Sequence, residues 1–135
     1  SRLPAMTPTS VANQYLATQV QSSRPLELIV LLYDAALRHT ATAREAMVRR
    51  DIATRRTALS KTMAIIGELQ NTLDMERGGA IASELDRLYG WMQSRLLDAI
   101  VQQDARPIDD TRRVLETLRD AWHTIASAPP AEAHP

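Results

Sequence analysis

Apolar side chains recur every three or four residues through most of this chain. The segments that show this spacing are residues 25–50, 52–74, 80–103 and 107–127. Such spacing gathers apolar side chains along one side of an α-helix, whereas no segment shows the strict alternation of a half-buried strand. The expected connections are short, so consecutive helices should pack antiparallel. The sequence therefore predicts an all-α fold, an antiparallel up-down four-helix bundle.

Several residues mark where these helices begin and end. Pro25 suits the first position of a helix, because its missing N–H would have no partner there, and Pro107 marks the start of the last helix. Asp51 is the expected N-cap of the second helix. Gly78 and Gly79 are expected to stop that helix, because glycine is common just beyond a helix end.

The two ends of the chain differ from this middle part. Residues 1–24 are rich in Ser, Thr and Gln and are expected to form a flexible arm. Tyr15 and Leu16 belong to an apolar series in the arm with the spacing of a short helix, which is stable only if it packs against the bundle. Residues 128–135 are proline-rich and are expected to be a disordered tail. The bundle domain is then residues 25–127.

The composition excludes several classes of protein. Acidic and basic side chains number 16 each, so the formal net charge is zero and a global field for polyanions is excluded. Cysteine is absent, which removes disulfides and thiolate metal sites and fits a reducing compartment. No apolar run approaches the length of a membrane span, and no signal peptide is evident. We therefore expect a cytoplasmic protein without membrane insertion.

The first helical segment carries more apolar residues than one buried face needs. Six of the seven residues from 26 to 32 are apolar, whereas a helix packed on one side needs a stripe about 100° wide. Either this helix is surrounded by others, or Leu28, Leu31 and Leu32 line a groove that takes a partner segment or the arm. Trp91 leaves the same choice open on the third helix, as a lateral core residue or the border of a groove.

No catalytic, cofactor-binding or metal-binding residue is predicted. His39 and His123 have no histidine or carboxylate neighbour at a clear metal-ligand spacing, so we interpret them as surface or boundary residues. Phosphate-loop and nucleophile-elbow motifs are absent as well. We therefore expect a protein that is not an enzyme.

Arginine provides every basic side chain except Lys61, and some arginines are clustered. The clusters lie around the first inter-helix turn and in the last helix: Arg49, Arg50, Arg55, Arg56, Arg112 and Arg113. They support an alternative function, a helical regulatory or adaptor domain that binds nucleic acid or another protein. The interspersed acids favour a solvated surface instead. Asp34 is expected to pair with Arg38, one helical turn away.

Several stretches resemble the flagellin-specific export chaperones, the FliS family. The first is Pro25-Leu-Glu-Leu-Ile-Val-Leu-Leu-Tyr-Asp34, and the clearest is Leu73-Asp-Met-Glu-Arg-Gly-Gly79. The others, in chain order, are Asn13-Gln-Tyr15, Leu59-Ser-Lys-Thr-Met-Ala-Ile-Ile66, Leu88-Tyr89, Met92, Arg95-Leu96-Leu97 and Asp120-Ala-Trp122. Their order and spacing together are more specific than any one of them.

This resemblance implies a cytosolic chaperone that binds the disordered C-terminal segment of flagellin and prevents premature polymerisation before secretion. No cofactor or nucleic acid is implied, and a second partner, such as an export-gate component or a co-chaperone, is left open. Tyr15 and Leu16 are expected to be a plug that the client displaces. The expected groove residues are Leu28, Leu31, Leu32, Tyr33, Trp91, Met92 and Arg95.

Overall fold

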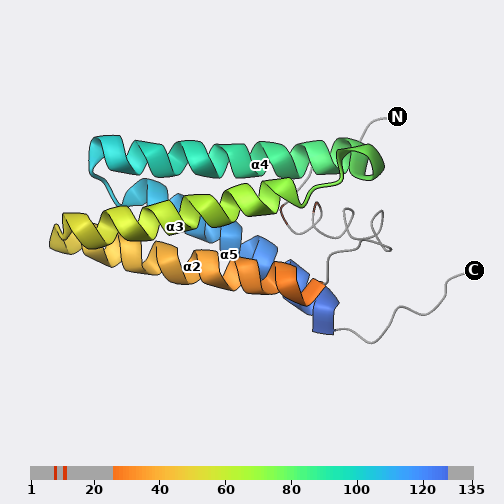
Figure 1. The fold of residues 1–135 in the computed structure, drawn as a ribbon, viewed down its shortest axis with the longest axis horizontal. Helices are drawn as coiled ribbons and strands as arrows, with labels where there is room; N and C mark the ends of the chain where they lie inside the picture. Colours follow the sequence, from red (N-terminus) through yellow and green to blue (C-terminus); the bar gives the residue numbers. More distant parts are fainter. Residues whose placement is uncertain (1–7, 9–10, 12–25, 128–135) are drawn as a thin grey trace, which may run out of the picture.

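The computed structural model describes residues 8, 11 and 26–127. Its elements within 26–127 are four long helices: α2 (Leu26–Arg49), α3 (Ile52–Asn71), α4 (Met75–Gln102) and α5 (Arg106–Ser127). In Figure 1 they lie along the long axis of the molecule, and consecutive helices run in opposite directions. The predicted all-α four-helix bundle is therefore confirmed.

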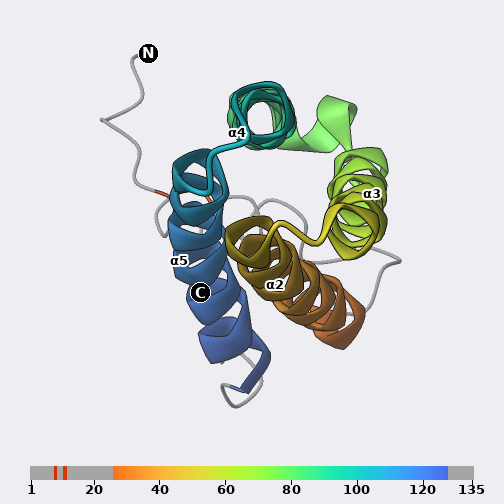
Figure 2. The same cartoon turned by 90° about the vertical axis from the view of Figure 1, so that its left-hand side faces the viewer.

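The four helices form a ring in which each contacts two neighbours. Helix α2 packs against α3 and α5, and α4 packs against the same two helices from the other side. Helices α2 and α4 consequently face each other across the diagonal, as the end-on view in Figure 2 shows. A groove that uses both α2 and α4 would therefore have to cross an intervening helix.

Aspartates begin two of the helices. The Asp51 carboxylate accepts a hydrogen bond from the Thr54 backbone N–H at 3.2 Å, as the predicted N-cap of α3 should. The Asp74 carboxylate does the same for α4, accepting from the Arg77 N–H at 3.0 Å.

The prediction that Gly78 and Gly79 end the second helix is wrong. Helix α3 already ends at Asn71, and the two glycines lie inside α4, where Gly79 has φ 51° and ψ −126° and interrupts the helix after its first turn. The physical reason is Asp74, because its capping side chain starts a new helical turn before the glycines are reached. Gly79 thus redirects a helix instead of ending one.

The core runs the length of the bundle and contains one residue of the N-terminal arm. Its largest fully buried side chains include Trp122, Tyr33 and Tyr89. Val11 is also fully buried in this core, so the arm contacts the bundle there. The other predicted features of residues 1–24 and the tail at 128–135 lie outside the described residues and stay predictions.

A pair of tyrosine hydroxyls joins the two diagonal helices at the centre of this core. Tyr33 on α2 and Tyr89 on α4 share a hydrogen bond of 2.5 Å, and the Trp122 ring on α5 lies 6.3 Å from the Tyr33 ring. Burial raises the pKa of Tyr33, and hydrogen bonds with Tyr89 and Trp122 partly offset this effect. Tyr33 therefore remains neutral and serves as a fixed polar link inside an apolar core.

Tyr89→Phe is expected to lower the free energy of unfolding by about 1–3 kcal/mol, because the buried Tyr33 hydroxyl loses a partner. Urea denaturation measures the change. The double variant Tyr33→Phe/Tyr89→Phe should cost less than the two single variants added together, since it leaves neither hydroxyl facing an absent partner. Strictly additive values would show that the two hydroxyls are not coupled.

Gly79→Ala is expected to lower the free energy of unfolding by about 1–3 kcal/mol, because its positive φ strains any residue with a Cβ. Gly90→Ala is the matched control on the same helix. Its φ is not positive and a Cβ there meets no atom within 4 Å, so alanine should raise stability by about 0.5–1 kcal/mol. Thermal and urea unfolding should show opposite signs for the two variants.

Candidate functional site

Exposed large apolar side chains occur at both ends of the bundle. At the end where α2 begins, Leu28 and Leu31 are 36% and 62% exposed. At the opposite end, where α2 and α4 finish and α3 starts, five more are exposed. They are Val48, Ile52, Leu97, Ile100 and Val101. Apolar patches of this kind on a monomer commonly mark contact surfaces.

The apolar run at the start of α2 divides between core and surface. Ile29, Val30 and Tyr33 are buried, Leu32 is half-buried against the core edge, and Leu28 and Leu31 point outward. The run therefore exceeds what the core uses, and the surplus lies on the surface. Helix α2 is therefore not surrounded on every side at its start.

Two residues predicted to line the groove are instead in the core. Tyr33 and Met92 are both 0% exposed. The Tyr33 hydroxyl is engaged with Tyr89, and Met92 lies on the same buried stripe of α4 as Leu85 and Leu96. Both side chains therefore lie on the buried faces of their helices, where apolar spacing alone also puts them.

Trp91 and Arg95 lie on a different side of the bundle from Leu28 and Leu31. The Arg95 guanidinium donates to Asp110 of α5 at 2.8 Å, so this face of α4 is turned toward α5. Trp91 is half-buried one turn earlier on the same face. Because α2 and α4 lie diagonally opposite and meet in the core, the exposed side chains of the predicted set lie on separate faces of the bundle.

Asp34 pairs with a different arginine from the one expected. Its carboxylate accepts a hydrogen bond from the Arg119 guanidinium of α5 at 2.7 Å, and this interaction raises the pKa of Arg119. The predicted partner Arg38 lies on the same helix, whereas α5 brings Arg119 in from the side. The pair closes one wall of an open cavity of about 330 Å³ that also includes Leu31.

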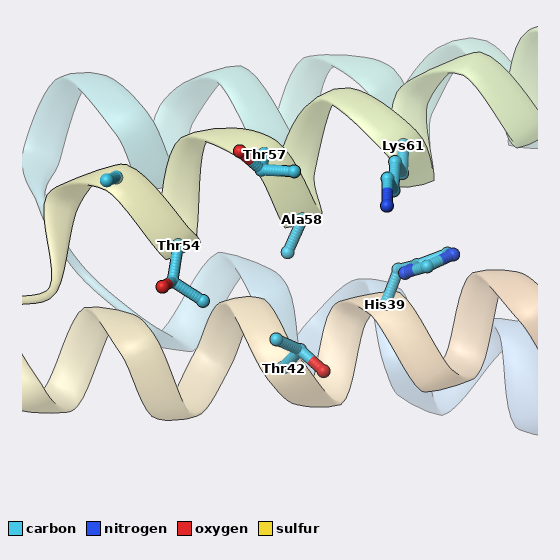
Figure 3. Close-up of a pocket in the computed structure, with 7 residues that line it drawn as sticks. His39, Thr42, Thr54, Thr57, Ala58 and Lys61 are labelled. Carbon is cyan, nitrogen blue, oxygen red and sulfur yellow. The ribbon is translucent and has the colours of Figure 1, made fainter.

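A second cavity, of about 300 Å³, lies between α2 and α3. It is lined by His39 and Thr42 of α2 and by Ala53, Thr54, Thr57, Ala58 and Lys61 of α3. Figure 3 shows His39 and Lys61 reaching toward one another from facing helices, with the threonines farther along the same two helices. Sequence reasoning treated His39 as a boundary residue and did not predict this cavity. The spacing Leu28, Leu32, Ala35, His39, a continuous helical stripe, is the signal that could have revealed it.

The basic side chains without an ion pair within the described residues lie on α2, α3 and the turn between them. They are Arg38, Arg50, Arg55, Arg56 and Lys61. By contrast, Arg112 and Arg113 of α5 pair with Glu116 and Asp110. One of the two arginine clusters that supported nucleic-acid binding is therefore engaged in ion pairs.

Two further features were sought in the described part of the chain. No set of three or more His, Cys, Asp or Glu side chains within residues 8, 11 and 26–127 is arranged to hold a metal ion. Among the helices α2–α5, none combines the length and apolar character that crossing a bilayer requires.

Comparison with known proteins gives consistent matches along most of the chain. The family model described as flagellar protein FliS matches residues 8–129. The flagellar secretion chaperone FliSB of Pseudomonas aeruginosa is 37% identical over 111 residues, which cover 82% of this chain and 88% of that protein. The flagellar secretion chaperone FliS of Salmonella typhimurium is 37% identical over 108 residues, covering 79% and 80%. That of Bacillus subtilis is 27% identical over 128 residues, covering 93% and 95%.

The His39 imidazole should titrate below the ordinary value of 6.5. Burial lowers its pKa first, and the positive charges of Arg38 and Lys61 lower it further. The unfolded chain then binds this proton more readily than the folded chain, so the His39 contribution to stability is complete above pH 6.5 and is lost as pH falls through the folded pKa.

An NMR titration of the His39 ring measures this pKa directly. Lys61→Met should move the pKa upward, because it removes one of the two cations. His39→Gln should remove its part of the pH dependence of unfolding. A His39 pKa at or above 6.5 in the folded protein would contradict the effects assigned to burial and to the two nearby cations.

Proposed function

Because the chain belongs to the FliS family of flagellar proteins, we propose that it is a cytoplasmic export chaperone for flagellin. It binds the disordered C-terminal segment of flagellin and keeps that segment from polymerising before secretion. The observation that carries the proposal is the pair of outward-facing leucines, Leu28 and Leu31, at the start of α2. Their exposure supports a surface that is completed by a partner.

A disordered amphipathic client gains helical structure when its apolar face meets such a surface. Fully burying one leucine side chain is favourable by about 1.5–3 kcal/mol. Leu28, Leu31 and the half-buried Leu32 together can therefore offset part of the entropy that the client loses on ordering. The same contacts hide the apolar face that would otherwise join another flagellin.

The N-terminal arm is the proposed occupant of this surface before the client arrives. Val11 is buried in the bundle core, which tethers the arm to the domain. Tyr15 and Leu16 follow within a few residues, a reach of at most about 18 Å from Val11. We place them over the leucines of α2 as a plug that flagellin displaces.

Two further exposed surfaces of the bundle are proposed to make additional contacts, one with the client and one with a second partner. Trp91 and Arg95 on the α5 side of α4 form a second, separate contact for a client long enough to pass around the bundle. The apolar side chains at the opposite end, such as Leu97 and Val101, are available to a second partner, such as an export-gate component or a co-chaperone.

Leu31→Asp should weaken binding of a peptide spanning the C-terminal segment of the host's flagellin by about tenfold or more, because a charge replaces an apolar contact. Isothermal titration calorimetry measures the affinity, and the wild-type protein should show a negative heat-capacity change with a gain of helicity. Leu31 is largely exposed, so the variant should fold, which circular dichroism checks.

Val101→Asp is the matched control, since Val101 is 81% exposed at the other end of the bundle. It should bind the peptide nearly as the wild-type protein does. Unchanged affinity in a folded Leu31→Asp variant would remove α2 from the client surface. A wild-type protein that does not bind the peptide would overturn the proposed function itself.

A further inference from the structure

We propose that the cavity between α2 and α3 binds a carboxylate of the client, with Lys61 and His39 as its cationic and hydrogen-bonding walls. The inference rests on the proposed function, because the carboxylate belongs to an acidic side chain of the bound flagellin segment. That segment lies along the seam between α2 and α3 and covers Leu28 and Leu32 with its own apolar residues.

The geometry of α2 places both kinds of contact in one line. Leu28, Leu32 and His39 are separated by four and seven residues, so they lie along the same edge of the helix. His39 and Lys61 line one cavity, so this edge is the one that faces α3. His39 is about 10 Å beyond Leu32 along the axis, or two turns. A helical client that follows the seam needs an acidic residue two turns from an apolar one.

The charge of the cavity is incomplete without a partner. Lys61 is exposed and forms no ion pair with any residue that the structure describes, and neither does Arg38 on the facing helix. Thr57 lines the same cavity, whereas the hydroxyls of Thr42 and Thr54 are already engaged, donating to the Arg38 carbonyl at 3.2 Å and to the Asp51 carboxylate. A carboxylate matches this set because it carries the opposite charge and accepts several hydrogen bonds.

Two acids of α2 and the acid that precedes α3 have other partners. Asp34 pairs with Arg119 of α5, Glu45 pairs with Arg49, and Asp51 caps α3 through Thr54. None of these carboxylates is directed to Lys61. A bound peptide can supply the missing negative charge and also cover the leucines farther along the seam, whereas a free anion would leave those leucines exposed.

The test compares Lys61→Met with Arg56→Met in calorimetric titrations with the flagellin C-terminal peptide. Arg56 is an exposed cation on the same helix that also has no ion pair within the described residues, and it does not line the cavity. Lys61→Met should weaken binding about tenfold and make affinity less dependent on salt, because a charge-assisted hydrogen bond is lost. Arg56→Met should leave the affinity within about twofold.

A double-mutant cycle identifies the client's acidic residue. Each Asp or Glu of the peptide is changed to Asn or Gln in turn and titrated against the wild-type protein and against Lys61→Met. One change should weaken binding to the wild-type protein but not to Lys61→Met. Its residue should lie about two turns from an apolar residue of the peptide.

The outcomes separate this inference from the proposed function. Equal affinities for wild type, Lys61→Met and Arg56→Met, with the peptide bound tightly, would overturn the carboxylate site and leave the chaperone function standing. The same holds if no acidic residue of the peptide couples to Lys61. A peptide that does not bind the wild-type protein overturns both.

Discussion

The hydrogen bond between Tyr33 and Tyr89 is the constraint on which the surface of this bundle depends. It crosses the diagonal between α2 and α4, whose backbones do not pack directly against each other. A buried hydroxyl that loses its partner is costly, so the two helices are held at one rotation and one height. Trp122 of α5 packs beside the pair and extends the constraint to a third helix.

Fixing the rotation of α2 also fixes what the molecule presents to solvent. With Tyr33 turned inward, Leu31 on the other side of the helix must face outward, and His39 must face α3. The ion pairs that α2 makes across helices, from Asp34 to Arg119 and from Arg44 to Asp109, both reach α5. This side of α2 is thereby joined to its neighbour by charge, and Leu31 lines the open cavity beside the Asp34–Arg119 pair. Leu28 lies on the edge of α2 that also carries His39 and faces α3.

The sequence predicted the features that depend on local chemistry. Helix existence follows from apolar spacing, and the Asp51 cap follows from a side chain that reaches its own helix. The errors concern contacts that depend on how a neighbouring helix is placed. Asp34 pairs with Arg119 and not with Arg38, because α5 brings Arg119 close to it. His39 and Lys61 are 22 positions apart, and they line one cavity only because of the α2–α3 register, which the sequence alone does not give.

The distribution of paired and unpaired charged side chains explains how one surface can bind apolar segments and also discriminate among them. On the α4–α5 side, arginines form ion pairs, as Arg95 does with Asp110. Their charges are therefore less available to bind a partner. On the α2–α3 side, Lys61 and Arg38 have no ion pair with described residues, and the exposed Leu28 lies farther along the same edge of α2 as His39. Leucines alone would hold any apolar helix, since apolar contact is not directional. A cationic cavity at a fixed distance from these leucines favours segments that carry an acidic residue at the matching position. Segments without that residue bind less well, because charge complementarity contributes specificity more than affinity.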